Sequence, residues 1–233
     1  MPSTTDTTAA HLHSYFRSSC SARVRTACHL KGIPLTYSYV DLLQGEHRQA
    51  SYTALNPSGS VPTLTLTDRA SGTAIITLGQ SVAILELLEE YFPDTPALLP
   101  ARDDVLARAR VRQLVNVLAA DVQPLTNMAV LLRVQALGAD HAAWARDVMA
   151  RGFAAYEKLA EGCAGRYSVG DCVTLADVML APAVEAAKRW GLSLDEWPVL
   201  ERVYGELMQI EAFRKGSWRE QEDTPLEFRT AAL

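Results

Sequence analysis

The pattern of the chain changes sharply near residue 97. Residues 11–93 alternate between strand-like and helix-like segments, whereas the residues after 100 are rich in Ala, Leu and Arg and have helix-like patterns without a strand signal. The change falls in the segment 94–100, where Pro96 interrupts regular structure. We therefore expect an α/β domain over 11–93, a linker over 94–100 and an all-helical domain over 101–233.

The expected α/β domain has the element order βαβαββα. Apolar alternation and turn residues place strands at 11–16, 35–42, 61–66 and 73–78, and helices from Ser18 to Gly32, over 46–55 and over 80–92. The last two strands form a hairpin through an Asp-Arg-Ala-Ser-Gly turn. The first ten residues are rich in Ser, Thr and Ala, with one acid and no base, so we expect a disordered tail there rather than a signal or transit peptide.

Composition and charge exclude several classes of function. A formal net charge of −5 provides no basic surface for nucleic acid or an anionic membrane. No run of 18 apolar residues is present, so we expect no membrane span. The four cysteines contain no C-x-x-C pair, which argues against a disulfide framework or a structural zinc site. We expect a cytoplasmic protein with reduced thiols and no metal.

The segment Ser18-Ser-Cys-Ser-Ala-Arg-Val-Arg25 predicts an anion site. Two hydroxyls and a thiol, from Ser18, Ser19 and Cys20, stand where an amphipathic helix begins, directly after Arg17. A serine at a helix start accepts hydrogen bonds from unpaired backbone N–H groups. The remaining N–H groups and the helix dipole favour a negative charge at the same place. The motif does not by itself identify the anion.

Two further segments have both a structural and a functional interpretation. Val61-Pro62 stands at a strand entry, where an X-Pro bond can be cis and leave the Val61 backbone free to pair with an extended peptide; the alternative is an ordinary loop proline. Gln80-Ser81 opens a strongly amphipathic helix, so Ser81 either caps that helix or joins Gln80 in binding a carboxylate.

Other polar positions are interpreted structurally. Thr174-Leu-Ala-Asp177 is a capping box, and Pro182 in the following apolar pattern predicts a kink or local break. Isolated arginines such as Arg17 and Arg189 are more often solvated than catalytic. We interpret Arg23 and Arg25 as helix-face or ion-pair residues.

Taken together, these motifs resemble the zeta class of the glutathione transferase family. The Ser18–Arg25 segment is specific to that class, and more widely shared motifs extend the resemblance over most of the chain. These are Asn56-Pro57, Val61-Pro62, Gln80-Ser81, Gln123-Pro-Leu-Thr-Asn127, Gly170-Asp-x-x-Thr-x-Ala-Asp177 and Asp223-Thr-Pro-Leu-Glu-Phe-Arg229. The resemblance implies a thioredoxin-like N-terminal domain, an all-α C-terminal domain, glutathione as cofactor and a homodimer.

The resemblance also assigns roles to individual residues. Ser18, Ser19 and Cys20 would surround the thiol of glutathione, and the Val61 backbone beside Pro62 would pair with its cysteinyl unit. Gln80 and Ser81 would hold its γ-glutamyl end, and His47 would contact its glycyl end. Gln123 and Asn127 would approach from the helical domain of this chain or of a dimer partner, and Arg17 and Arg189 would face a carboxylate substrate. Two positions depart from the class. Ala22 replaces a large aromatic residue, and His47 replaces the glutamine of the animal members and adds pH sensitivity.

The implied reaction is the glutathione-dependent cis–trans isomerisation of maleylacetoacetate to fumarylacetoacetate, a step of phenylalanine and tyrosine catabolism. The bound thiolate, rather than Cys20, would be the nucleophile, and a general transferase activity would accompany it. Alternatives within the family are maleylpyruvate isomerisation and the dehalogenation of small α-halo acids. A thiol–disulfide oxidoreductase that uses Cys20 is an alternative of another class, and a non-catalytic module is a third.

Overall fold

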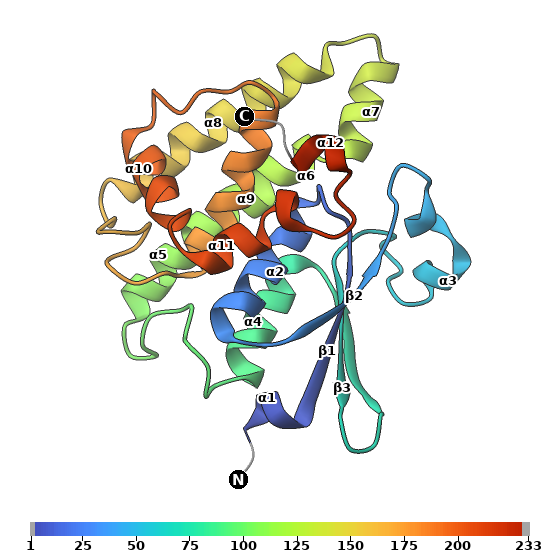
Figure 1. The fold of residues 1–233 in the computed structure, drawn as a ribbon. Coiled ribbons are helices and arrows are strands. Elements are labelled where there is room, and N and C mark those ends of the chain that lie inside the picture. Colours follow the sequence, from blue (N-terminus) through green and yellow to red (C-terminus); the bar gives the residue numbers. More distant parts are fainter. Residues whose placement is uncertain (1–2, 230–233) are drawn as a thin grey trace. The chain divides into compact units, whose positions relative to one another are not determined.

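A computed structural model describes residues 3–229 of the chain and divides them into two units, which are considered separately (Figure 1). The first unit contains residues 3–97 together with 211–229, and the second contains Leu98–Ile210. The expected boundaries placed residues 211–229 in the helical part, whereas their contacts join them to the α/β part. Residues 1–2 of the expected tail and 230–233 of the expected helical domain lie outside the described residues.

The first unit is built on a four-stranded sheet in the order β2-β1-β3-β4. β1 (Thr8–Ser14) pairs in parallel with β2 (Leu35–Tyr39) and antiparallel with β3 (Thr63–Asp68), which pairs antiparallel with β4 (Ala74–Gly79). α2 (Ser19–Lys31) and α4 (Ser81–Tyr91) lie on one side of this sheet, and the short η1 (Glu46–Arg48) and α3 (Ala50–Thr53) lie on the other (Figure 1). This is the thioredoxin-like arrangement that the resemblance implies, and the expected order of strands and helices agrees with it.

The core of the first unit follows from the two periodicities of its elements. Alternate residues of β1 are buried, and apolar residues of β3, α2 and α4 close over the same side of the sheet. Its fully buried members include Leu12, Leu64, Leu66, Val24, Ala27, Ile84 and Leu88. α2 ends as expected at Gly32, whose left-handed backbone (φ 65°) favours glycine, and the Gly32 N–H is donated to the carbonyls of Cys28 and His29.

Three local expectations are wrong. Residues 4–10 are not a disordered tail but form α1 (Thr4–Thr7) and the beginning of β1, because the Thr-Ala-Ala segment gains its strand conformation by pairing with β3. The helix expected over 46–55 is instead η1 followed by α3. α11 (Glu211–Gly216), η3 (Trp218–Glu220) and α12 (Leu226–Arg229) belong to the first unit, where α11 packs against α2.

The second unit is all-helical, as the sequence predicts. Its elements are α5 (Val105–Asn116), the π-helical η2 (Val117–Val122), α6 (Gln123–Thr126), α7 (Met128–Ala136), α8 (His141–Ala160), α9 (Leu175–Arg189) and α10 (Pro198–Leu207). α9 is buried from Leu175 to Ala187 and continues as α-helix through Pro182, so no local break occurs there. Among the described residues, no single helix has the length and apolar content needed to cross a membrane.

The buried carboxylate of Asp177 organises the start of α9. It accepts hydrogen bonds from the Thr174 N–H at 2.7 Å, the Thr174 hydroxyl at 3.0 Å and the Ser168 N–H at 2.9 Å. The capping box is therefore confirmed, and it also anchors the loop before the helix. Burial raises the pKa of Asp177, although the hydrogen bonds oppose this change.

Candidate active site

The start of α2 has the geometry that the sequence predicts. Ser18 is the N-cap residue, and its Oγ accepts a hydrogen bond from the Ser21 N–H at 3.1 Å. The Ser18 hydroxyl uses a lone pair in that bond, so its own proton remains available for donation to a ligand. Ser19 and Cys20 occupy the first turn and are half-buried. The first turn of this 13-residue helix therefore combines a free hydroxyl donor with the positive end of the helix dipole.

Arg23 connects the start of α2 with the start of α4. Its Nη1 donates to Ser81 Oγ at 3.1 Å and contacts Cys20 Sγ at 3.5 Å. The side chain is buried, with 2% of its surface exposed, so its interpretation as a helix-face residue is wrong. A helical separation of three residues from Cys20 is the sequence signal that points to this contact. Two predicted parts of the site, Cys20 and Ser81, are thus brought together by a residue that was not predicted.

The backbone of Gln80 adopts an unfavourable conformation at the start of α4. It is the one non-glycine residue with positive φ among the described residues, with φ 65° and ψ 108°. Its side chain makes no capping bond, and Ser81 does not cap α4 but receives the Arg23 bond. The capping interpretation of Ser81 is therefore wrong. Such strain, which costs about 1–3 kcal/mol, is found mainly at functional sites.

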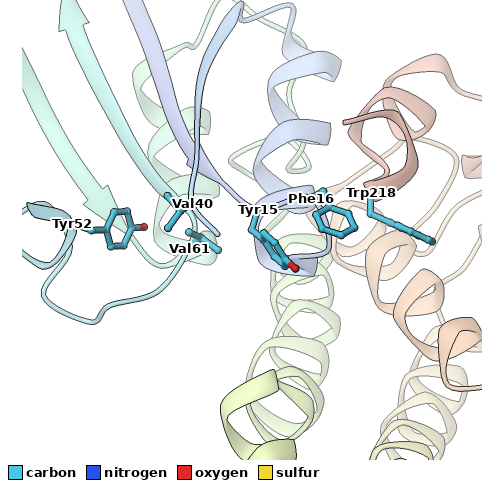
Figure 2. Close-up of a cluster of buried hydrophobic side chains, with 6 residues drawn as sticks. All are labelled: Tyr15, Phe16, Val40, Tyr52, Val61 and Trp218. Atoms are coloured by element: carbon cyan, nitrogen blue, oxygen red, sulfur yellow. The ribbon is translucent and has the colours of Figure 1, made fainter. Parts of the chain in front are cut away.

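Val61 presents an unpaired backbone. The Val61–Pro62 peptide bond is cis, and no hydrogen bond of the described residues involves the Val61 N–H or C=O. Its side chain is held in a buried cluster beneath the ends of β1 and β2, with Tyr15, Phe16, Val40, Tyr52 and Trp218 (Figure 2). The backbone of Val61 is thus fixed next to the segment that leads into α2, with one donor and one acceptor free.

His47 lies in η1, and its imidazole is held in one tautomer. Arg48 Nε donates to His47 Nε2 at 3.2 Å, which places the ring proton on Nδ1. Nδ1 is buried without a partner among the described residues. Burial lowers the pKa of His47, and the charge of Arg48 lowers it further, so both favour the neutral ring. The carbonyl of His47 packs against Gly59, two residues before Val61.

The loop before α2 is fixed by two residues that sequence reasoning did not assign to the site. The fully buried Arg25 donates to the carbonyls of Tyr15 (3.5 Å), Phe16 (3.3 Å) and Gly216 (3.0 Å). The carboxylate of Asp223 accepts the Phe16 N–H at 2.8 Å, and burial raises the pKa of this carboxyl. Arg17 is exposed, with its guanidinium 5.8 Å from the ring centroid of Phe228.

The remaining predicted residues lie in the second unit. Asn127 caps α7, because its Oδ1 accepts the Val130 N–H at 3.0 Å while its Nδ2 donates to the Pro124 carbonyl at 2.8 Å. Gln123 begins α6, and Arg189 ends α9 with a 3.4 Å bond to the Glu185 carbonyl. The roles of Gln123, Asn127 and Arg189 in a site with residues of the first unit stay predictions.

Comparisons with known proteins identify relatives over most of the chain. Residues 17–91 match the family model described as glutathione S-transferase, N-terminal domain, and residues 142–206 match the corresponding C-terminal domain. A maleylacetoacetate isomerase of Emericella nidulans is 48% identical over 94% of this chain and 95% of its own length. The rat protein of the same name is 41% identical over 94% and 97%. A crystal structure of maleylacetoacetate isomerase from Anaeromyxobacter dehalogenans with bound glutathione has a TM-score of 0.84, with 40% identity over 94% of this chain and 99% of that one.

The chain therefore belongs to the glutathione S-transferase family. Within that family its similarity is to the zeta class: a maleylpyruvate isomerase described as a zeta-class bacterial glutathione transferase has a TM-score of 0.84 and 38% identity over 92% of this chain and all of its own.

Proposed function

We propose that this protein is a glutathione-dependent isomerase that converts maleylacetoacetate to fumarylacetoacetate. We further propose that it acts as a cytoplasmic homodimer in phenylalanine and tyrosine catabolism, with a glutathione transferase side activity. Support comes from relatives of that name that match more than nine-tenths of the chain. The observation that carries the proposal is the Ser18 hydroxyl, which caps α2 and keeps its proton for an anionic ligand.

The residues of the first unit fit glutathione. An extended tripeptide can pair with the unused N–H and C=O of Val61, and a carboxylate can accept bonds at the start of α4 from Gln80 and Ser81. The Nδ1–H of His47 is a donor without a partner among the described residues, which suits the glycyl carboxylate. A thiol near Ser18 would lie beside Ser19 and Cys20 in the first turn of α2.

The main task of this site is to favour the anionic form of a thiol. A free thiol with a pKa of about 8.5 is only about 3% ionised at pH 7. Lowering that pKa by about two units raises the ionised fraction roughly 25-fold at pH 7. A roughly 25-fold gain in thiolate concentration is equivalent to about 1.9 kcal/mol in the activation free energy. A hydrogen bond from Ser18 and the N–H groups of the first turn of α2 can supply a shift of this size.

When bound, glutathione supplies a thiolate that adds reversibly to an activated cis double bond, so that the bond can rotate before the thiolate leaves. The chain has to stabilise negative charge on the substrate as this happens. Arg17 and Arg189 are proposed to hold the substrate carboxylate and the oxygen on which charge develops, through charge-assisted hydrogen bonds. No net proton transfer is required, because the same thiolate enters and departs.

The test compares the cis–trans turnover of maleylacetoacetate and maleylpyruvate, each with and without glutathione. The proposal expects turnover of maleylacetoacetate that depends on glutathione. A higher kcat/KM for maleylpyruvate would identify the alternative substrate, which a 40% identical maleylpyruvate isomerase from a Ralstonia species also suggests. A rate independent of glutathione would contradict the mechanism.

Cys20→Ala separates isomerisation from thiol–disulfide exchange. Cys20 Sγ contacts Arg23, and the next cysteine, Cys28, is fully buried, where desolvation raises its pKa to about 12. A thiol of that pKa is a poor resolving group at neutral pH. We expect Cys20→Ala to keep most of the isomerase activity, whereas an oxidoreductase would lose its disulfide exchange.

A further inference from the structure

Arg23 is a buried cation for which the described residues of the first unit provide no counter-ion. Its guanidinium contacts two neutral groups, Ser81 Oγ at 3.1 Å and Cys20 Sγ at 3.5 Å, and its Nε is buried without a hydrogen-bond partner. No ion pair among residues 3–229 includes it. Burying a charge without an opposite charge is unfavourable, and an anionic ligand bound near Arg23 would reduce this cost.

The other buried cations of the same helix are used differently. Arg25 donates to the carbonyls of Tyr15 and Phe16 in the loop before α2 and to the Gly216 carbonyl. Lys31 pairs with Glu89 at 2.7 Å and donates to the Pro96 carbonyl at 3.0 Å. Both therefore have evident structural roles in holding the chain. Arg23 instead lies between two helix starts, with its terminal nitrogen directed at the first residue of α4 and the first turn of α2.

We propose that Arg23 is a positioning residue for the γ-glutamyl carboxylate of glutathione. Ser81 Oγ accepts the hydrogen bond from Arg23, so the Ser81 hydroxyl keeps its own proton for donation to the carboxylate. Arg23 thereby holds the Ser81 hydroxyl in place as a donor. The guanidinium also supplies the positive charge that a carboxylate at the start of α4 needs in a buried setting. This inference rests on the proposed function, because it takes glutathione as the ligand.

The test uses calorimetry with two peptides that differ only in the group concerned. Glutathione carries the carboxylate, whereas γ-aminobutyryl-cysteinyl-glycine lacks it and keeps the thiol and the glycyl end. The wild-type protein should prefer glutathione. Arg23→Gln should reduce this preference about tenfold through loss of glutathione affinity, while the affinity for the analogue changes by less than about twofold. Ser81→Ala should have the same effect, and the double variant should lose little more than either single one.

Arg23→Lys keeps the charge and provides a second variant if Arg23→Gln does not fold. It should retain part of the preference, because an ammonium can still donate to Ser81 but cannot reproduce the guanidinium geometry. Thermal melting of every variant shows which are folded. If Arg23→Gln fails to fold, the proposal is tested by Arg23→Lys alone. A preference for glutathione below that of the wild-type protein, down to that of Ser81→Ala, supports the proposal.

Three results would overturn the role of Arg23. These are an unchanged preference in the folded variants, an equal loss of affinity for both peptides, and losses in Arg23→Gln and Ser81→Ala that simply add. Each of them requires a wild-type protein that binds glutathione, so the proposed function would stand. A wild-type protein that binds neither peptide would overturn the proposed function and this inference together.

Discussion

Replacing Ser18 by alanine separates helix capping from catalysis. The change removes the 3.1 Å bond that caps α2, which should lower the free energy of unfolding by about 1 kcal/mol. It also removes the donor to the thiolate, and a hydrogen bond to a charged group contributes about 1.5–3 kcal/mol. That loss raises the pKa of the bound thiol by about 1–2 units. Starting from a pKa of about 6.5, the ionised fraction at pH 7 then falls roughly 3- to 25-fold, and kcat/KM should follow.

The assay is the pH profile of kcat/KM for the glutathione-dependent isomerisation, from pH 5.5 to 9.5. In Ser18→Ala the rise of the profile should move to higher pH by about 1–2 units, so that most of the activity returns near pH 9. Ser18→Gly should show the same displacement with only a few tenths of a kcal/mol lost from stability, because glycine is tolerated at an N-cap.

A matched control is Asp140→Ala. Asp140 caps α8 by accepting the N–H groups of Ala142 and Ala143 at 2.9 and 3.0 Å, so its loss should cost a similar amount of stability. Its pH profile should not move. If Ser18→Ala lost stability while its pH profile stayed with that of Asp140→Ala, Ser18 would be a cap and nothing more, and the reasoning would be refuted.

Three further predictions concern strain, burial and pH. Gln80→Gly should raise the free energy of unfolding by up to about 1 kcal/mol, because glycine tolerates positive φ, while calorimetry should show weaker glutathione binding; unchanged stability would argue against strain. Asp177→Ala leaves three buried donors unpaired and should cost about 3 kcal/mol or more in urea unfolding; a loss below about 1 kcal/mol would contradict its anchoring role. The pKa values of His13, His29 and His47 are lowered, mainly by burial, so the native state binds fewer protons than the unfolded state does near pH 6.5. The free energy of unfolding should therefore fall as the pH drops from 7.5 to 6, through the unfolded-state pKa of about 6.5. Stability that rises as the pH drops over this range would refute the assignment.

The parts of the fold that were predictable are those that local patterns determine. Apolar alternation and helical stripes gave the order of the first unit, and capping chemistry placed the start of α2 at Ser18 and its end at Gly32. The strand pairing that begins at Thr8 could not be predicted, because a Thr-Ala-Ala segment has no pattern of its own and is ordered by β3.

The parts of the site that were missed depend on contacts distant in sequence. Asp223 accepts the Phe16 N–H of the loop before α2 from 207 residues away, and Arg25 links the same loop to Gly216, 191 residues further along the chain. The burial of Arg23 depends in the same way on Ser81, 58 residues further along. A charge pattern on one helix does not reveal such partners, and for that reason both arginines were interpreted as helix-face or ion-pair residues.

The central claim is that the start of α2 ionises the thiol of a bound tripeptide. The most direct measurement titrates glutathione against the purified protein from pH 5 to 9 and follows the ultraviolet absorbance of the thiolate. We predict a midpoint about two units below the value of about 8.5 for a free thiol, and a return toward that value in Ser18→Ala. A midpoint for the wild-type complex near that of free glutathione would contradict the account.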